Sequence, residues 1–397
     1  MNENKLVPKR RFKEFKNTDA WERCKLGEIV EKQIKGKAKL SELGEGNVEY
    51  LDTSRLNGGS PLLTNGTVDV NEQDIVILWD GSKAGTVYTG FTGALGSTLK
   101  AYRTSADSNF VYQSLKRQQE LIYKKYRTPN IPHVQKDFLE EFKITISKTQ
   151  EQKKIGVFFK ILDENINLHK CELKKMKSLK VAYLSEMFPD ESNKKPKRRF
   201  KEYTGDWERY KLGKLIDISS AARVHKNEWT ISGVRFFRSS DIMAAYNGTV
   251  NQKAFISPDL YEKLALISGK VKLDDVLVTG GGSVGIPYLV SDTEPLYFKD
   301  ADLIWLKNSE IINGYFLYTF FITPFFRKYI STISHIGTIS HYTIQQVNET
   351  PIMLPSMDEQ IKIGLFFKTL DKTIALQQYK LDKLQNLKKA YLNEMFV

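Results

Sequence analysis

The five histidines are the first candidates for metal ligation or acid–base catalysis in this sequence. No H-E-x-x-H motif and no Cys/His ligand spacing surrounds them. The G-x-S-x-G motif of hydrolases and the G-x-x-x-x-G-K phosphate loop of nucleotide motors are also missing. The sequence therefore favours a binding or targeting subunit with no catalytic, metal or cofactor site of its own. The histidines are His133, His169, His225, His335 and His341.

One glycine-rich loop, GGGSVG at 280–285, has the composition of a phosphate cradle. A related stretch, DGSKAG at 80–85, lies at the matching place in the first half of the chain. Because both halves carry the element, we expect a turn between strands and not a cofactor loop.

The segments that hold these loops belong to an internal repeat. The stretch 151–188 returns without a gap at 359–396, with more than half of its positions identical. In each copy apolar residues step by three and four, which is typical of a coiled coil, and a helix of this length spans roughly 55 Å. An ordinary amphipathic core helix is the alternative for either copy alone, but two matching seams in one chain predict that the helices pair with each other. The matched positions that depart from the apolar pattern are predicted to fix the register, and these are His169 with Gln377 and Lys180 with Lys388.

A second repeat precedes each globular body. The stretch PKRRFKEFKNTDAWERCKLGEI at 8–29 reappears as PKRRFKEYTGDWERYKLGKLI at 196–216. Seven residues separate the first long helix from the second PKRRF, and eight would do so if the two chain ends were joined. The sequence is therefore nearly circular, and it predicts a pseudo-two-fold molecule with antiparallel helices.

The expected fold class is α+β, with two mixed α/β bodies separated and joined by an antiparallel coiled coil of two long helices. Both bodies show short alternating strands broken by glycine turns, with some helix. We expect a first body with its basic lead-in at 1–150, a long helix at 151–188, a basic linker at 189–205, a second body at 206–357 and a second long helix at 358–397.

The charge balance suggests a polyanionic partner. Among 397 residues, 60 Lys and Arg face 47 Asp and Glu, a net charge of +13, as in many nucleic-acid-binding proteins. A merely basic protein is the alternative. The two cysteines, Cys24 and Cys171, and the polar N-terminus fit a reducing cytoplasm without a signal peptide. The richest apolar run, at 311–326, is too short and too interrupted to span a membrane and is expected to be a buried helix.

Two dissimilar bodies on paired helices suit a DNA duplex recognised at two places. Half-sites on one face of B-DNA repeat about every 34 Å, which helices of roughly 55 Å can bridge. Because the bodies differ, the target is expected to be asymmetric and bipartite, with an unrecognised spacer whose length the helices set.

Three motifs carry a resemblance to a known family. The WE-x-x-x-LG segments at 21–27 and 207–213, the EQ-x-x-IG-x-FF-x-x-LD helix starts and the K-x-A-Y-L-x-EMF helix ends resemble the specificity subunit of type I restriction-modification systems. The resemblance covers essentially the whole chain. It implies that the bodies are target-recognition domains, that the helices act as a spacer and that the chain has no catalytic activity. It further implies double-stranded DNA, two methylase (M) subunits and restriction/translocase (R) subunits as partners, with the S-adenosylmethionine and ATP/Mg sites on those partners.

DNA contacts are expected from the turns and loops that match between the halves. The first body offers Thr53, Ser54, Arg55, Ser82, Lys83, Tyr88, Asn130 and His133. The second offers Arg238, Ser239, Ser240, Ser283, Tyr288, Ser340 and His341. Arg55 and Arg238 lead because arginine binds guanine or phosphate in bidentate fashion. For each residue a solvated turn position is the alternative.

For two further sets of residues, the basic PKRRFK runs and the apolar helix positions outside the seam, a purely structural role is the alternative to a binding role. The PKRRFK runs are expected to be solvated linkers first and phosphate contacts second. Apolar positions outside the helix seam are candidates for methylase docking, with packing against their own domains as the alternative. These positions are Leu168, Leu179, Leu184, Leu376, Leu387 and Leu392.

Two other classes of function stay open. A self-contained methyltransferase or nuclease would need a cofactor or metal-carboxylate motif, and labelled S-adenosylmethionine crosslinking to the isolated chain would support it. A coiled-coil scaffold that binds only proteins predicts no salt-dependent affinity for DNA.

Overall fold

The computed structural model describes residues 6–39, 43–130, 132–190, 193–299, 302–308, 310–334 and 341–397. The chain divides into two compact units. The first unit comprises Met1–Cys171 with Tyr379–Val397, and the second comprises Glu172–Gln378. Each of the two long helices, α5 (Thr149–Glu186) and α11 (Met357–Met395), therefore contributes one part to each unit.

The first unit holds two sheets and a separate strand pair. The four-stranded sheet has the order β2-β8-β5-β6 with antiparallel neighbours, and the three-stranded sheet has the order β4-β3-β7. The strands of the four-stranded sheet are β2 (Val30–Lys35), β5 (Ile75–Leu78), β6 (Val87–Tyr88) and β8 (Leu99–Thr104). Those of the three-stranded sheet are β3 (Leu43–Leu51), β4 (Leu62–Thr64) and β7 (Ala94–Leu95). The separate pair is β1 (Glu22–Lys25) with β9 (Lys143–Ile146).

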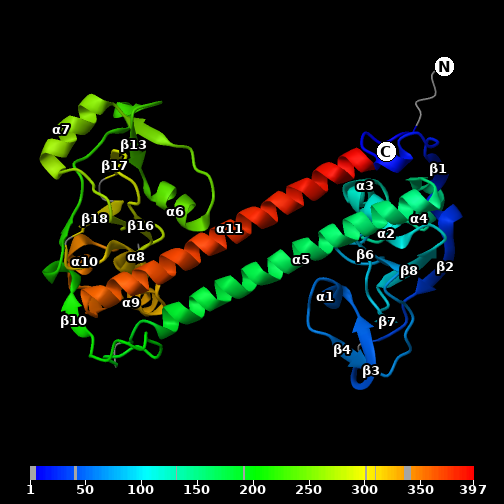
Figure 1. Ribbon diagram of the computed structural model, residues 1–397, viewed down its shortest axis with the longest axis horizontal. Coiled ribbons are helices and arrows are strands. Elements are labelled where there is room, and N and C mark those ends of the chain that lie inside the picture. Colours follow the sequence, from blue (N-terminus) through cyan, green and yellow to red (C-terminus); the bar gives the residue numbers. More distant parts are fainter. Residues whose placement is uncertain are drawn as a thin grey trace. The chain divides into compact units, whose positions relative to one another are not determined.

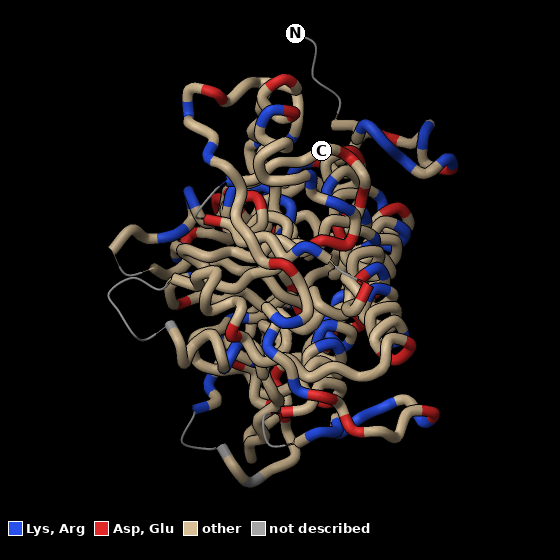
Figure 2. Tube along the Cα trace, turned by 90° about the vertical axis from the view of Figure 1, so that its left-hand side faces the viewer, with Lys and Arg blue, Asp and Glu red and all other residues tan. Residues whose placement is uncertain are grey.

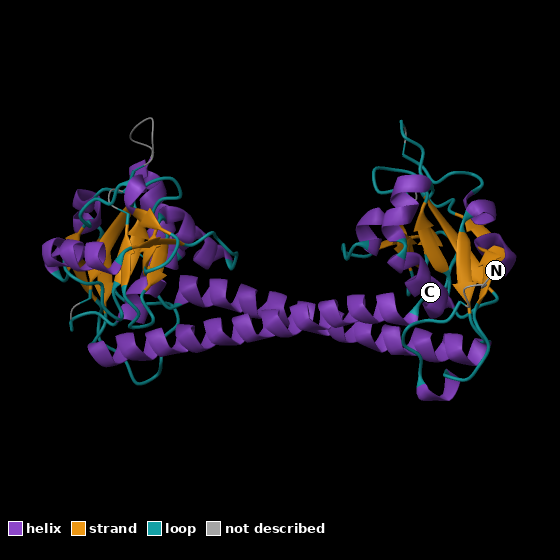
Figure 3. Ribbon diagram, turned by 90° about the horizontal axis from the view of Figure 1, so that it is seen from above, coloured by secondary structure: helices purple, strands orange, loops and turns teal. Residues whose placement is uncertain are grey.

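Short helices precede and connect these strands, and helices lie beside the sheets (Figure 3). They are η1 (Lys13–Phe15), η2 (Leu26–Ile29), α1 (Thr53–Leu56), α2 (Ser108–Arg117), α3 (Gln119–Lys125) and α4 (Phe138–Glu141). The sheet core follows from sequence, because all four residues of β5 are buried and apolar. A strand of this kind is covered on both faces.

The second unit repeats this plan with a larger second sheet. Its first sheet has the order β11-β18-β15-β16, its second β12-β14-β13-β17, and β10 pairs with β19. The strands are β10 (Glu208–Lys211), β11 (Asp217–Ser219), β12 (Trp229–Thr230), β13 (Val234–Phe237), β14 (Ala254–Ile256), β15 (Val276–Thr279), β16 (Pro287–Leu289), β17 (Leu296–Phe298), β18 (Leu303–Lys307) and β19 (Pro351–Leu354). The shorter helices are η4 (Leu212–Lys214), η5 (Lys226–Glu228), α6 (Ser239–Asn247), α7 (Pro258–Ser268), α8 (Gly314–Ile322), α9 (Pro324–Ser334) and α10 (Ile344–Glu349).

The apolar run at 311–326 is buried as expected, but it is not one helix. It forms α8 and the start of α9, because the chain breaks at Thr323, whose hydroxyl accepts a hydrogen bond from Phe326 N at 3.2 Å. Pro324 has no N–H to continue α8 and is well placed as the first residue of α9. Among the described helices, none is long and apolar enough to cross a membrane.

The two long helices run antiparallel within each unit, as predicted (Figure 1). In the first unit Phe158, early in α5, packs on Tyr391, late in α11, with ring centroids 5.2 Å apart. In the second unit Tyr183, late in α5, packs on Phe366, early in α11, at 5.1 Å. These two contacts join equivalent residues of the repeat.

Three of the four predicted register positions, Lys388, Lys180 and Gln377, contact the other long helix. Lys388 Nζ lies 2.5 Å from Asp163 Oδ1 in the first unit, and Lys180 Nζ lies 2.5 Å from Asp371 Oδ1 in the second. Gln377 Nε2 donates to Glu172 Oε2 at 2.6 Å. Each of these off-pattern side chains therefore bonds to a residue on the other helix, which fixes the stagger.

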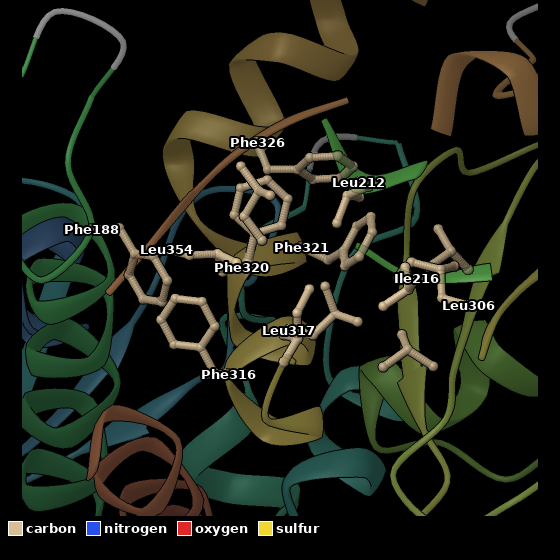
Figure 4. Close-up of a cluster of buried hydrophobic side chains, with 14 of the residues drawn as sticks. Phe188, Leu212, Ile216, Leu306, Phe316, Leu317, Phe320, Phe321, Phe326 and Leu354 are labelled. Atoms are coloured by element: carbon tan, nitrogen blue, oxygen red, sulfur yellow. The ribbon is translucent and has the colours of Figure 1, made fainter. Parts of the chain in front are cut away.

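The helix ends enter the core of each unit. In the second unit Phe188 stacks on Phe316 of α8 at 5.2 Å, within a cluster that also holds Phe326 and Leu354 (Figure 4). In the first unit Phe396 packs on Phe110 of α2 at 5.1 Å. Leu184 belongs to the buried cluster of the second unit, so it is a core residue and not an exposed docking position.

The expectation that the PKRRFK arginines are solvated is wrong for Arg11 and Arg199. Arg11 donates to both oxygens of Glu151, at 2.7 and 2.6 Å, and Arg199 donates to both oxygens of Glu359, at 2.7 Å each. These guanidinium groups are 4% and 15% exposed and fix each lead-in segment to the start of a long helix. The hydrogen bonds raise the pKa of both arginines.

Candidate nucleic-acid interface

The glycine loop is a turn in both units, as predicted. In the first unit it follows β5, and Gly85 N donates to Leu78 O at 2.7 Å. In the second it follows β15, and Gly285 N donates to Thr279 O at 2.7 Å. Each turn therefore closes on the strand that leads into it.

The segment carrying a histidine lies against this turn in each unit. Gly81 N donates to Pro132 O at 2.9 Å, and Tyr342 N donates to Gly280 O at 2.8 Å. These bonds bring His133 beside Asp80 and His341 beside Gly281 as bridge partners. The structure thus unites two sets of predicted site residues that are distant in sequence, the turns and the histidines.

An arginine that sequence reasoning missed supports each turn. Arg127 Nη1 donates to Ser82 O at 3.0 Å, and Arg327 Nη1 donates to Val284 O at 3.3 Å. Arg327 also donates to Phe321 O at 2.7 Å. The sequence does place an arginine just after or within a helix that follows the sheet strands, and this position could have pointed to them. Both arginines bind backbone carbonyls, however, and a pattern of side chains does not reveal such partners.

Both leading candidates for DNA contact already have acidic partners. Arg55 is paired with Glu49, and its guanidinium lies 5.7 Å from the centre of the Phe91 ring. Arg238 Nε donates to Asp241 Oδ2 at 2.8 Å, and this hydrogen bond raises its pKa. Either guanidinium would have to share or leave its carboxylate to bind a base or phosphate, so DNA contact by these residues stays a prediction.

The remaining predicted residues fall into three groups. Exposed side chains, free to meet a ligand, are Ser54, Ser82, Lys83, Asn130, Ser240, Ser283 and His341. Half-buried ones are Thr53, His133, Ser239 and Tyr288. Tyr88 is a core residue, 8% exposed, whose hydroxyl lies 3.3 Å from Asn57 Nδ2, and Ser340 lies outside the described residues.

Charged side chains of both signs are distributed over both units (Figure 2). Lys and Arg are interspersed with Asp and Glu along the trace (Figure 2). In the part of the chain that the structure describes, no three His, Cys, Asp or Glu side chains are grouped to hold a metal ion. The arrangement can donate hydrogen bonds and positive charge from turns at one end of each sheet.

Two segments of the chain, residues 18–178 and 204–386, match the family of the type I restriction modification DNA specificity domain. The chain belongs to this family. Its two bodies are tandem DNA specificity domains, as in the specificity subunits of type I restriction-modification systems.

Relatives agree with this assignment. The chain is 28% identical to the type I restriction enzyme MjaVIII specificity subunit of Methanocaldococcus jannaschii, over 94% of this chain and 91% of that protein. It is 26% identical over 170 residues to a putative type I restriction enzyme specificity subunit of Haemophilus influenzae, covering 41% of this chain and 40% of that one.

Solved structures support the fold. The S subunit of a type I restriction-modification system from M. genitalium superposes with a TM-score of 0.70 at 18% identity, over 99% of both chains. A chain from a study of complex assembly and conformational transition of the type I R-M system gives 0.50 at 15% identity, over 95% of this chain and 97% of that one. The predicted fold class is confirmed.

Proposed function

We propose that each DNA specificity domain of this chain recognises one half of an asymmetric, bipartite site in double-stranded DNA. The observation that carries the proposal is that the two units share their supporting contacts while the residues of their turns differ. Equivalent turns present Asp80, Ser82 and Lys83 in one unit and Gly281, Ser283 and Val284 in the other. Different donors and acceptors at the same structural place are what recognition of two different half-sites requires.

The two long helices set the unrecognised spacer in this proposal. Each is uninterrupted, and 38 residues of α5 at about 1.5 Å per residue give roughly 57 Å. Their exposed apolar side chains are the docking candidates for two methylase subunits. Leu168, Leu179, Leu376 and Leu387 are each at least 40% exposed, whereas Leu392 is half-buried.

Catalysis belongs to the partners in this proposal. Methylase subunits would carry S-adenosylmethionine, restriction/translocase subunits would carry ATP and Mg²⁺, and this chain would hold none of these. The absence of the phosphate loop and of hydrolase and metalloprotease motifs from the sequence supports that division. A cytoplasmic location stays a prediction with it.

A domain exchange tests the proposal. Residues 30–150 are replaced by those of another family member, and the modified adenines in host DNA are mapped by sequencing. We expect one half-site to change while the other half-site and the spacer stay the same. The matched control replaces 217–350 instead and should change only the other half-site. A change of both halves in either chimera, or a single continuous motif for the parent chain, would contradict the proposal.

A further inference from the structure

A row of lysines follows the end of β2 in the first unit. Lys35, Lys37 and Lys39 are all exposed, while the intervening Gly36 and Ala38 are buried. Backbone hydrogen bonds from Lys37 N and Ala38 N to Leu95 O, at 3.0 and 3.1 Å, fix the segment. The side chains of the three lysines are therefore all open to solvent on the outer side of this segment.

The backbone packing makes this row dependent on glycine at position 36. A Cβ on Gly36 would lie 1.9 Å from Gly96 O, so no other residue fits without moving the chain. The glycine brings the segment close against the sheet and leaves the flanking lysines on its outer side.

A fourth lysine joins the row from the neighbouring strand. Lys35 lies directly opposite Lys100 of β8, an arrangement of like charges that destabilises an antiparallel pair. Lys100 Nζ lies 3.2 Å from the centre of the Trp79 ring, and partial burial lowers its pKa. Asp80 attracts Lys100 electrostatically, but among the described acidic residues none forms an ion pair with Lys35, Lys37, Lys39 or Lys100. An external anion would relieve this repulsion.

The row adjoins the glycine turn. β2 and β5 flank β8 and both run antiparallel to it, so β2 and β5 end where β8 begins, at the same end of the sheet. Trp79, which contacts Lys100, immediately precedes the turn that holds Ser82 and Lys83. The lysines thus continue the surface formed by the turn and His133.

The equivalent positions of the second unit are neutral. Ser219 pairs with Trp305 in β18, so extending the register by one residue places Ser220 opposite Ile304. Leu99 pairs with Leu78 as Leu303 pairs with Thr279, which makes Ile304 the equivalent of Lys100. By this register Lys35, Lys37 and Lys39 correspond to Ser220, Ala222 and Val224, and the exposed Arg223 stands at the position of Ala38.

We propose that Lys35, Lys37, Lys39 and Lys100 form a contact surface for the phosphate backbone of duplex DNA. The second unit has no lysine at the positions equivalent to Lys35, Lys37 and Lys100. The occupant is chosen by charge complementarity and by continuity with the turn. The inference rests on the proposed function and adds to it an asymmetry: the first unit supplies a larger share of the salt-dependent, sequence-independent affinity.

The test uses the full chain and a labelled DNA duplex of random sequence. The triple variant Lys35→Gln, Lys37→Gln, Lys39→Gln is titrated at several salt concentrations. Each lost phosphate contact lowers the slope of log K against log salt by about 0.9, so we expect a fall of about 2 to 3. Between about 50 and 200 mM salt the variant should lose roughly 40-fold less affinity than the parent chain.

A charge-matched control replaces Lys153, Lys160 and Lys170, which are exposed on the α5 part of the same unit. This variant should keep the parental slope, and unchanged thermal unfolding should show that both variants are folded. A parental slope in the Lys35/Lys37/Lys39 variant would overturn the inference, as would an equal loss in both variants. If the parent chain itself shows no salt-dependent DNA affinity, the proposed function fails together with the inference.

Discussion

In each unit the part that packs against the start of a long helix, α5 or α11, is called the helix-bound part. The helix-bound parts of the two units are built from the same contacts. The bidentate pair Arg11–Glu151 has its counterpart in Arg199–Glu359. The side-chain oxygen of Gln152 accepts from Asp107 N at 3.0 Å, and that of Gln360 accepts from Asn313 N at 3.1 Å. The same two residues, Asp107 and Asn313, are also the N-caps of equivalent helices, α2 in the first unit and α8 in the second.

The outer sheets of the two units show no such agreement. The second sheet has three strands in the first unit and four in the second. The helix after β3, α1, has 4 residues, whereas the helix after β13, α6, has 9, and α7 follows β14 in the second unit. The two units therefore differ in their outer sheets and agree in the contacts that they make with the long helices. A repeated scaffold therefore presents two different surfaces, which is the property that a bipartite recognition protein needs.

The largest effect should come from breaking the buried arginine pairs. Arg11→Ala leaves Glu151, which is 1% exposed, as an uncompensated buried charge, and Arg199→Ala does the same to Glu359. Removal of one partner of such a pair costs about 3–5 kcal/mol. We expect both variants to lose stability by similar amounts, measured by chemical denaturation with hydrogen exchange in each unit as the local readout.

The matched control replaces both partners. Arg11→Met with Glu151→Leu removes the pair without leaving a buried charge and should recover most of the loss. If Arg11→Ala and Arg199→Ala differed by several kcal/mol, the two scaffolds would not be energetically equivalent, and the comparison would hold for geometry alone.

The next effect concerns an aspartate that joins three helices in each unit. Asp163 accepts from Lys388 of α11 and, at 2.7 Å, from Gln113 of α2. Asp371 accepts from Lys180 of α5 and, at 2.9 Å, from Tyr315 of α8. The aspartate is the same in both units although its partner on the body differs.

Asp163→Asn and Asp371→Asn should each cost about 2 kcal/mol, because a hydrogen bond to a charged group contributes about 1.5–3 kcal/mol and the amide keeps part of it. Tyr315→Phe removes one bond to the Asp371 carboxylate and should cost about 1.5 kcal/mol, the lower end of the same range. Denaturation midpoints check both values. A Tyr315→Phe loss as large as that of Asp371→Asn would mean that the body contact, and not the lysine between the helices, dominates.

The sequence predicted the scaffold well because its signals are periodic and repeated. Two gapless copies implied paired antiparallel helices, and the off-pattern Lys180 and Lys388 were correctly expected to fix the register. The burial of Arg11 and Arg199 was missed, because their partners lie more than a hundred residues away and a basic run normally remains solvated. The site was predicted only in part, since the acidic partners of Arg55 and Arg238 and the burial of Tyr88 depend on tertiary packing.

A smaller effect is expected where each long helix touches a capping residue. A Cβ on Gly156 would lie 2.3 Å from Asp107 Oδ1, and one on Gly364 would lie 2.6 Å from Asn313 Oδ1. Alanine would displace the cap, at about 1–2 kcal/mol, and regain up to about 1 kcal/mol of helix propensity. The net loss for Gly156→Ala and for Gly364→Ala should be about 1 kcal/mol in thermal unfolding.

Adding Asp107→Ala to Gly156→Ala separates the causes. If displacement of the cap is the reason, the double variant should be no less stable than the more damaged single variant. Full additivity of the two losses would show that the alanine methyl group clashes with the backbone of α2 instead.

The smallest effect on stability at neutral pH is expected from a tyrosine that occurs on both α2 and α8, Tyr112 and Tyr318. Its effect on stability becomes clear only at alkaline pH. Burial raises the pKa of Tyr112 to about 12 and that of Tyr318 to about 12, and the nearby Asp163 and Asp371 add to the shift. In the unfolded chain tyrosine loses its proton near pH 10, whereas the folded chain keeps it to about pH 12. The folded state therefore holds more protons above pH 10, so the stability that is complete below pH 10 is lost as pH rises toward 12. Tyr112→Phe and Tyr318→Phe should each flatten this loss by similar amounts and leave unfolding at pH 7 almost unchanged, with tyrosinate absorbance as the independent check. If only one of the two variants flattened the alkaline loss of stability, the helix-bound parts would be alike in structure but would differ in how strongly they raise the pKa of this tyrosine.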